Sequence, residues 1–308
     1  MRFEAVAYEP WQRDALRGLM REVWGASAPA EEFDWWFERN PAGRRLISLV
    51  VDGERIAGAS AMSFFRMRLD GREHEVPFAL DAAMHPDYRG QGLWSLLELH
   101  NEEESARDGA PAVLGFPNPI SRAILVGKLG WRDLARLRLW ARPLAGHGGR
   151  GRGVEPFERF GPDAEALYAE ARRVWGNHLV RSADFLNWRY ADSPRPYRRF
   201  AARRDGRLEG YAVLGQKEYA GWNVGVVADL VGSPRAVRAL LGRCAREARG
   251  VRALVALVSP AQRRAFLASG FAPTHKSIRF IGKPLQPGVD LPAERRAWHF
   301  TLGDMDIF

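Results

Sequence analysis

The stretch from residue 76 to residue 100 constrains the fold of this chain more than any other. Residues 76–84 have the composition of a buried strand, and apolar residues recur at helical spacing over 93–100. Between them lies a short basic turn with two glycines, Gly90 and Gly92. Glycine permits a positive φ and a close approach of the backbone to a ligand. A helix start carries unpaired N–H groups and a partial positive charge, so the stretch predicts a strand, a turn and a helix that bind an anion such as phosphate.

The turn reads Arg89-Gly90-Gln91-Gly92-Leu93-Trp94. It resembles the acyl-CoA signature of the GNAT superfamily of N-acyltransferases, which is Arg or Gln, two residues, Gly, one residue, then Gly or Ala. The last position departs from the signature, because Trp94 stands where a small residue is usual. We expect its backbone N–H to remain a donor and its indole to point away from a bound pyrophosphate.

Length and composition limit the alternatives. The 308 residues suggest about two domains, and 46% of them are hydrophobic. The first fourteen residues lack the apolar run of a signal peptide, and no stretch approaches the roughly 20 apolar residues of a membrane helix. The single cysteine, Cys244, excludes an intrachain disulfide and a cysteine metal cluster. We therefore expect a cytoplasmic protein without metal or membrane partner.

The charge of the chain has two interpretations. The net charge of +9 comes mainly from arginine and attracts anions in general, of which CoA is one and nucleic acid another. The arginines are spread along the chain, so we interpret most of them as part of the general amino-acid composition and not as a binding site. We therefore consider a nucleic-acid partner unlikely.

Matching motifs recur in the same order in both halves of the chain. They include Val-Trp-Gly at 23–25 and 174–176, Phe-x-x-Trp at 33–36 and 185–188, and Asp-Gly at 52–53 and 205–206. This order indicates a duplication. We expect an N-terminal domain over 1–145, a glycine- and arginine-rich linker over 146–155, and a C-terminal domain with its tail over 156–308.

The expected fold class is α/β (α+β), with two GNAT-like domains, each a mixed, mostly antiparallel sheet flanked by helices. The second copy is degenerate at the phosphate turn. Eleven positions separate Pro86 from Leu97, whereas only seven separate Pro234 from Leu241. The missing residues fall on the glycine turn, so only the first domain should hold CoA.

The resemblance assigns the CoA contacts mostly to main chain. It implies that Ala82, Ala83 and Met84 pair with the pantetheine arm and that a backbone N–H near Met84 polarises the thioester carbonyl. It implies that the pyrophosphate binds the amides of the turn and first helical residues, Gly90, Gln91, Gly92, Leu93, Trp94 and Ser95, and that Arg89 adds a formal charge. In relatives, a side chain at the position of Asn118 reaches the pantetheine arm, although Asn before Pro is also a helix N-cap.

A base must take a proton from the attacking amine, which is an ammonium at neutral pH. We name Asp81, on the strand before the turn, as the candidate. The matching Asp229 of the second half suggests the alternative that this aspartate serves the fold. His85, His74 and Glu75 are weaker candidates, and we expect His85 to be exposed.

Two further features concern proton transfer. Many relatives use a tyrosine to protonate the departing thiolate, and Val126 occupies that place here. The acidic C-terminal tail, with Asp304, Asp306 and the carboxylate of Phe308, offers another base if it folds into the cleft; a solvated tail is the default.

These observations favour an N-acyltransferase that transfers acetyl from acetyl-CoA to a primary amine of a small molecule, such as an amino sugar or a metabolite. Two alternatives remain open. One is an aminoacyl-tRNA-dependent transferase or other RNA-linked protein, which an intact CoA turn argues against. The other is a non-catalytic CoA-binding scaffold, which the missing tyrosine permits.

Overall fold

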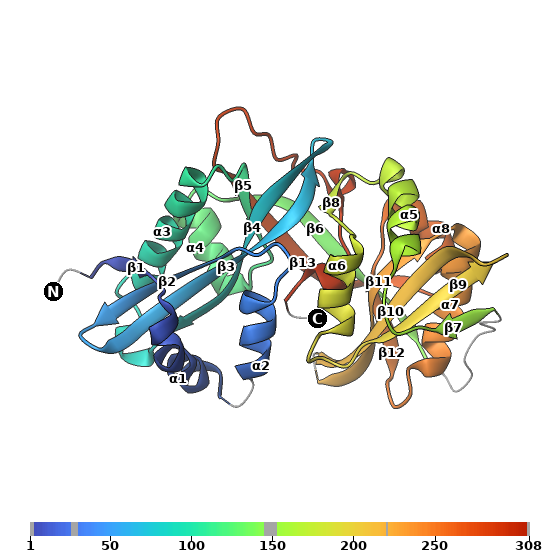
Figure 1. Cartoon of the computed structure of the whole chain (residues 1–308), viewed down its shortest axis with the longest axis horizontal. Helices are drawn as coiled ribbons and strands as arrows, with labels where there is room; N and C mark the ends of the chain where they lie inside the picture. Colours follow the sequence, from blue (N-terminus) through green and yellow to red (C-terminus); the bar gives the residue numbers. More distant parts are fainter. Residues whose placement is uncertain (1–2, 26–29, 145–152, 220, 307–308) are drawn as a thin grey trace. The chain divides into compact units, whose positions relative to one another are not determined.

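The computed structural model describes residues 3–25, 30–144, 153–219 and 221–306 (Figure 1). These residues form two compact units that are not sequential along the chain. Unit 1 contains residues 1–67, 73–135 and 279–293, and unit 2 contains 68–72, 136–278 and 294–308. Most of the linker expected at 146–155 lies outside the described residues.

Unit 1 is built on one mixed sheet in the order β1-β2-β3-β4-β5-β13. The pairs β1–β2 and β2–β3 are antiparallel, β4 and β5 are parallel, and β13 pairs antiparallel with β5. The strands are β1 (Ala5–Ala7), β2 (Arg45–Asp52), β3 (Arg55–Leu69), β4 (Arg72–Met84), β5 (Ala112–Gly115) and β13 (Ala272–Pro284). The hairpin signal at Asp52-Gly53 accounts for the β2–β3 turn, where Gly53 has a φ of 62°.

Helices cover both faces of this sheet. They are α1 (Arg13–Trp24), α2 (Ala30–Phe33) continued by a π-helical turn (Asp34–Glu38), α3 (Leu93–Arg107) and α4 (Pro119–Lys128). Trp94 of α3 and Leu125 of α4 pack with Met62 of β3, so both helices cover one face. Trp36 of the π-helical turn packs edge-on against Phe65, which the strand alternation places on the opposite face.

The strands of unit 2 are hydrogen-bonded in the order β6-β12-β11-β10-β9-β7 and are also mixed in direction. Neighbouring strands are antiparallel except β11 and β12, which are parallel. The strands are β6 (Arg132–Pro143), β7 (Val154–Pro156), β9 (Arg198–Arg204), β10 (Arg207–Tyr219), β11 (Trp222–Gly232) and β12 (Ala253–Leu257); β8 (Asn177–Leu179) pairs with β14 (Trp298–His299). The helices are α5 (Pro162–Ala171), α6 (Ala183–Leu186) with a π-helical turn (Asn187–Ala191), α7 (Pro234–Glu247) and α8 (Arg263–Ala268).

The order of elements is the same in both halves of the chain. Each runs through a short helix with a π-helical turn, three antiparallel strands, a long helix, a short parallel strand, a second helix and a final long strand. The final strands are exchanged: β13 completes the sheet of unit 1 beside β5, and β6 completes that of unit 2 beside β12. The expected fold class, α/β with a mostly antiparallel sheet flanked by helices, is confirmed, and the duplication itself stays a prediction that this order favours.

The C-terminal tail is bound inside unit 2. The fully buried guanidinium of Arg181 contacts Asp229 of β11 at 3.0 Å and Asp304 of the tail at 2.7 Å. Arg189, also buried, donates to the carbonyl oxygens of Gly303 and Met305 at 2.8 and 3.0 Å. Asp304 is therefore buried in an ion pair, and the expectation of a solvated tail is wrong for this residue.

In the described part of the chain, no helix is long and apolar enough to span a membrane.

Candidate functional site

The turn between β4 and α3 has the conformation that its glycines predict. After Met84 the chain makes a 3-10 turn (Pro86–Tyr88) and then enters α3 through Gly90 and Gly92, whose φ angles are 79° and 77°. Gly92 is the N-cap of α3. A Cβ on either glycine would meet no atom within 4 Å, so both glycines border open space.

The amides of this turn have the unpaired donors that an anion site needs. The first recorded helical bond runs from Leu96 N to Gly92 O, at 3.3 Å. Among the described residues, no backbone acceptor is recorded for the N–H groups of residues 90–92 outside regular elements. The first turn of any α-helix leaves its N–H groups without an intrahelical partner. The N–H groups of residues 90–95 therefore have no backbone acceptor recorded in the described part of the chain.

Side chains hold the turn from both sides. Arg89 Nε donates to the carbonyl oxygen of Met84 at 3.1 Å, which ties the turn to the end of β4. The hydroxyl of Tyr88 donates to Asp52 Oδ2 at 2.7 Å, which raises the pKa of Tyr88. The indole of Trp94 is half-buried and packs against the cluster that contains Leu125 and Trp131.

His85 is buried, with 3% of its surface exposed, so the expectation that it is exposed is wrong. Its Nδ1 accepts from the backbone N–H of Asp87 at 3.2 Å, and its Nε2 lies 2.6 Å from Glu22 Oε1 on α1. The guanidinium of Arg55 on β3 lies 2.5 Å from the same Nε2. His85 therefore binds α1 to the turn.

The strand before the turn is partly uncovered although it lies in the middle of the sheet. It pairs with β5 at two positions, where Phe78 is opposite Leu114 and Ala79 is opposite Gly115. Beyond this point β5 ends, while residues 80–82 and Met84 of β4 stay half-buried. The aromatic rings of Phe78, Phe116 and Phe280 form a row with centroid separations of 6.0 and 5.2 Å at the point where the two strands part.

Asp81 lies on this uncovered part of β4 and is half-buried. His74 and Glu75 lie near the other end of the same strand. At about 3.3 Å per residue, nine strand residues place Glu75 roughly 30 Å from Met84. Glu75 is also paired with Arg44 at 3.2 Å. This distance separates His74 and Glu75 from the turn, whereas Asp81 lies only three residues before Met84.

Asn118 begins α4 beyond the end of β5. Its Oδ1 accepts from the N–H groups of Ile120 and Ser121 at 3.0 and 2.9 Å, so the predicted N-cap is confirmed. Its amide Nδ2 donates no recorded bond within the described residues and remains available to a ligand. Val126, in place of the usual tyrosine, packs with the apolar cluster under α4.

Sequence reasoning missed the polar layer beneath α3. Glu98 and Glu102 are both buried on the inner side of this helix. Glu102 accepts from Trp131 Nε1 and from Lys283 Nζ, each at 2.5 Å, whereas Glu98 accepts from the hydroxyl of Ser60. Burial raises the pKa of Glu98 to about 7, and the negative charge of Glu102 adds to the shift. The sequence contains a signal for this layer: Glu98 and Glu102 are four residues apart, and each directly follows a residue that faces the sheet, Leu97 or Asn101.

The matched aspartate of unit 2 has a structural role. Asp229 is fully buried in its pair with Arg181, and burial raises its pKa.

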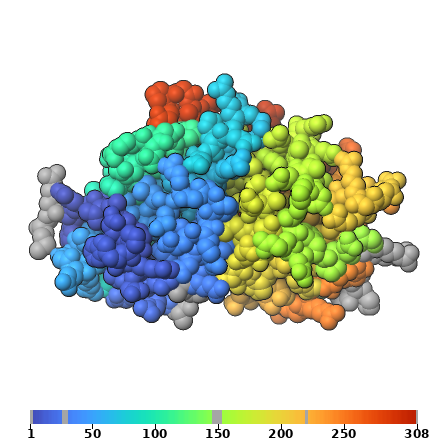
Figure 2. Space-filling model, in the orientation of Figure 1, coloured from blue at the N-terminus to red at the C-terminus, as the bar shows by residue number. Residues whose placement is uncertain are grey.

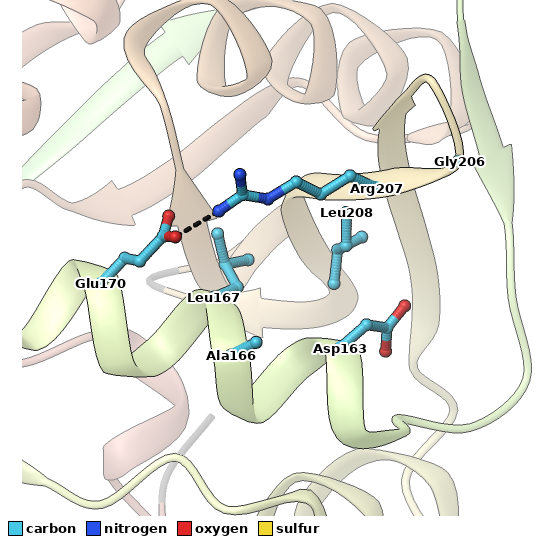
Figure 3. Close-up of a pocket in the computed structure, with 7 residues that line it drawn as sticks. All are labelled: Asp163, Ala166, Leu167, Glu170, Gly206, Arg207 and Leu208. Carbon is cyan, nitrogen blue, oxygen red and sulfur yellow. Dashed lines mark hydrogen bonds and ion pairs between the residues drawn. The ribbon is translucent and has the colours of Figure 1, made fainter.

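A small hollow also lies in unit 2, between α5 and the β9–β10 turn, where Arg207 is paired with Glu170 (Figure 3). Its volume of about 90 Å³ is far too small for a nucleotide.

Comparison with known proteins agrees with this geometry. A family model described as acetyltransferase (GNAT) domain matches residues 9–133. A search of curated proteins found no match. A GCN5-related N-acetyltransferase from Anabaena variabilis superimposes with a TM-score of 0.70 at 15% identity, covering 92% of this chain and 73% of that one.

Two other solved structures share the fold. A GCN5-related N-acetyltransferase from Kribbella flavida gives a TM-score of 0.65 at 20% identity, with coverages of 92% and 71%. The N-myristoyltransferase of Saccharomyces cerevisiae, solved with myristoyl-CoA, gives 0.63 at 12% identity, with coverages of 96% and 83%. Residues 9–133, which contain the strand, turn and helix described above, match the acetyltransferase (GNAT) domain model, and the solved structures share the fold of the chain.

Proposed function

We propose that this protein transfers an acetyl group from acetyl-CoA to a primary amine of a small molecule, such as an amino sugar or a metabolite, in the cytoplasm. One observation carries the proposal. Gly90 and Gly92 have left-handed backbone conformations, and unpaired amides follow them at the start of α3, beside the uncovered end of β4. A diphosphate fits such a site, because several N–H donors and the helix dipole act on its charge together.

The remaining contacts follow the strand. The main chain of Ala82, Ala83 and Met84 would pair with the pantetheine arm in place of the strand that β5 does not continue. The amide Nδ2 of Asn118 would donate to the same arm, since its Oδ1 is already used as a cap. The amides of residues 90–95 would bind the pyrophosphate, with the Arg89 side chain adding a positive charge beside them.

The chemical step requires one base. The amine nitrogen attacks the thioester carbonyl carbon, the C–S bond breaks, and the thiolate leaves. Asp81 would take the proton that the amine loses, directly or through one water. Since Val126 replaces the tyrosine acid, solvent would protonate the thiolate.

Titration calorimetry with acetyl-CoA tests the site. We expect wild type to bind, and Gly92→Asp to lose binding by at least tenfold, because the substitution adds a carboxylate where the phosphates lie. Gly109→Asp is the matched control: Gly109 follows α3 at its other end, has a φ of 81° and also borders open space. Equal loss in both variants, or no heat with wild type, would contradict the proposed site.

Thiol release with a panel of amines tests the reaction. Asp81→Asn should lower kcat by about 10²- to 10⁴-fold and leave acetyl-CoA binding unchanged. An unchanged kcat would remove Asp81 from the mechanism. Binding of acetyl-CoA without release on any amine would instead identify a scaffold.

A further inference from the structure

The formal charge is divided unequally between the two units. Unit 1 contains 16 Lys and Arg against 21 Asp and Glu, whereas unit 2 contains 30 against 16. The arginines are spread along the chain, but the excess of basic over acidic residues is confined to unit 2. A net excess of 14 positive charges in one unit predicts a strongly acidic partner for that unit.

The outer side of α7 concentrates part of this charge. With 3.6 residues per turn, Arg235, Arg238 and Arg246 lie within about 80° of one another around the helix, and Arg249 follows in the next loop. The opposite side of α7 carries Val237, Leu240, Leu241 and Cys244, which are buried in the core of unit 2. We call Arg235, Arg238, Arg246 and Arg249 the arginine row.

Most of the row is available to a partner. Arg235, Arg238 and Arg249 are exposed. Within the described residues, no ion pair is recorded for any of these three. By contrast, Arg203 and Arg207 of β9 and β10 are paired with Asp163 and Glu170.

An exposed tryptophan continues the row. Trp222 begins β11 and has 51% of its surface exposed, with the guanidinium of Arg252 at 4.3 Å from its ring centroid. Hydrogen bonds join its hairpin to the loop after α7: Gln216 Nε2 donates to Arg249 O at 2.8 Å, and Arg252 N donates to Asn223 O at 3.1 Å. The segments β10, β11 and α7, yellow to orange in Figure 2, contribute to the visible surface of the molecule.

We propose that the arginine row, together with Trp222 and Arg252, binds a single-stranded nucleic acid. The 14 residues of α7 extend over about 21 Å, so the charges form a line that fits successive phosphates and not a single converging site. The exposed indole offers a stacking surface for an unpaired base, which a duplex does not present. This inference goes beyond the proposed acetyl transfer and does not depend on it.

Fluorescence anisotropy with the full chain and a labelled 20-mer of oligouridylate tests the proposal, with oligothymidylate in parallel to separate RNA from DNA. Three phosphate contacts, one for each available arginine of the row, predict a slope of log K against log salt of about −2. The variant Arg235→Gln/Arg238→Gln/Arg249→Gln should reduce the slope by about 2. Trp222→Ala should weaken binding by about tenfold or more at constant salt, because stacking of one base is lost.

The matched control is Arg159→Gln/Arg203→Gln/Arg207→Gln, which removes the same charge from unit 2. These arginines are already paired with Asp192, Asp163 and Glu170, so the salt slope should stay unchanged. Equal weakening in both triple variants would overturn the proposal, since binding would then follow net charge alone. Absence of binding at 50 mM salt would overturn it as well, as would binding to phosphatidylserine vesicles but to neither oligonucleotide.

Discussion

Glu98 makes the stability of unit 1 depend on pH in an unusual direction. Only 2% of its surface is exposed, and its Oε2 accepts no hydrogen bond of ordinary geometry from the described residues. Its pKa rises from 4.5 to about 7, first because of burial. The folded chain therefore holds this proton more tightly than the unfolded chain, and stability falls as pH rises from 4.5 to 7.

The size of the effect follows from the shift. Each pKa unit corresponds to about 1.4 kcal/mol, so the free energy of unfolding should fall by about 2 to 3 kcal/mol between pH 5 and pH 8 through this group alone. Glu98→Gln keeps an acceptor for the Ser60 hydroxyl and cannot ionise. The variant should therefore lose this pH dependence and be more stable than wild type at pH 8.

Urea unfolding at pH 5, 6, 7 and 8, followed by tryptophan fluorescence, measures the difference. Glu103→Gln on the exposed side of the same helix is the control, and its curve should run parallel to wild type. Parallel curves for wild type and Glu98→Gln would refute the argument, because Glu98 would then ionise as readily in the folded chain as in the unfolded one.

Three further outcomes are expected. Asp304→Asn should lower the free energy of unfolding by about 3 to 5 kcal/mol, because Arg181 loses a buried partner, and should expose the tail to limited proteolysis. The control Asp192→Asn, in an exposed pair, should lower the free energy of unfolding by under about 1 kcal/mol. Burial lowers the pKa of His178 to about 4, so wild type should lose up to about 3 kcal/mol as pH falls from 6.5 to 4, and thermal unfolding of His178→Gln should lack this loss. Asn118→Ala should lower the free energy of unfolding by about 0.5 to 2 kcal/mol, because the helix cap is lost. Asn118→Asp should keep the cap and weaken acetyl-CoA binding several-fold in calorimetry. If Asn118→Asp binds acetyl-CoA as wild type does, Asn118 serves only as a cap.

Local patterns predicted the turn because its chemistry is local. Positive φ at Gly90 and Gly92, the cap at Asn118 and the hairpin at Asp52-Gly53 each depend on neighbouring residues. The sheet assignments followed from alternation and composition in the same way. The fold class and the strand–turn–helix of the candidate site were therefore accessible from the sequence.

Long-range burial was not accessible. Whether His85 is exposed depends on Glu22 of α1, 63 residues earlier, and the pairing of Arg181 with Asp304 joins residues 123 positions apart. Neither of these relations leaves a periodic signal in the sequence.

The exchanged strands also limit how this chain can be cut. A fragment that ends at residue 145 contains β5 but lacks β13, so the edge of β5 would expose unpaired N–H and C=O groups to other molecules. A fragment that begins at residue 156 lacks β6, so the edge of β12 would expose unpaired N–H and C=O groups as well. Genetic separation of the two halves should therefore yield two aggregation-prone polypeptides, and their co-expression should restore solubility to both.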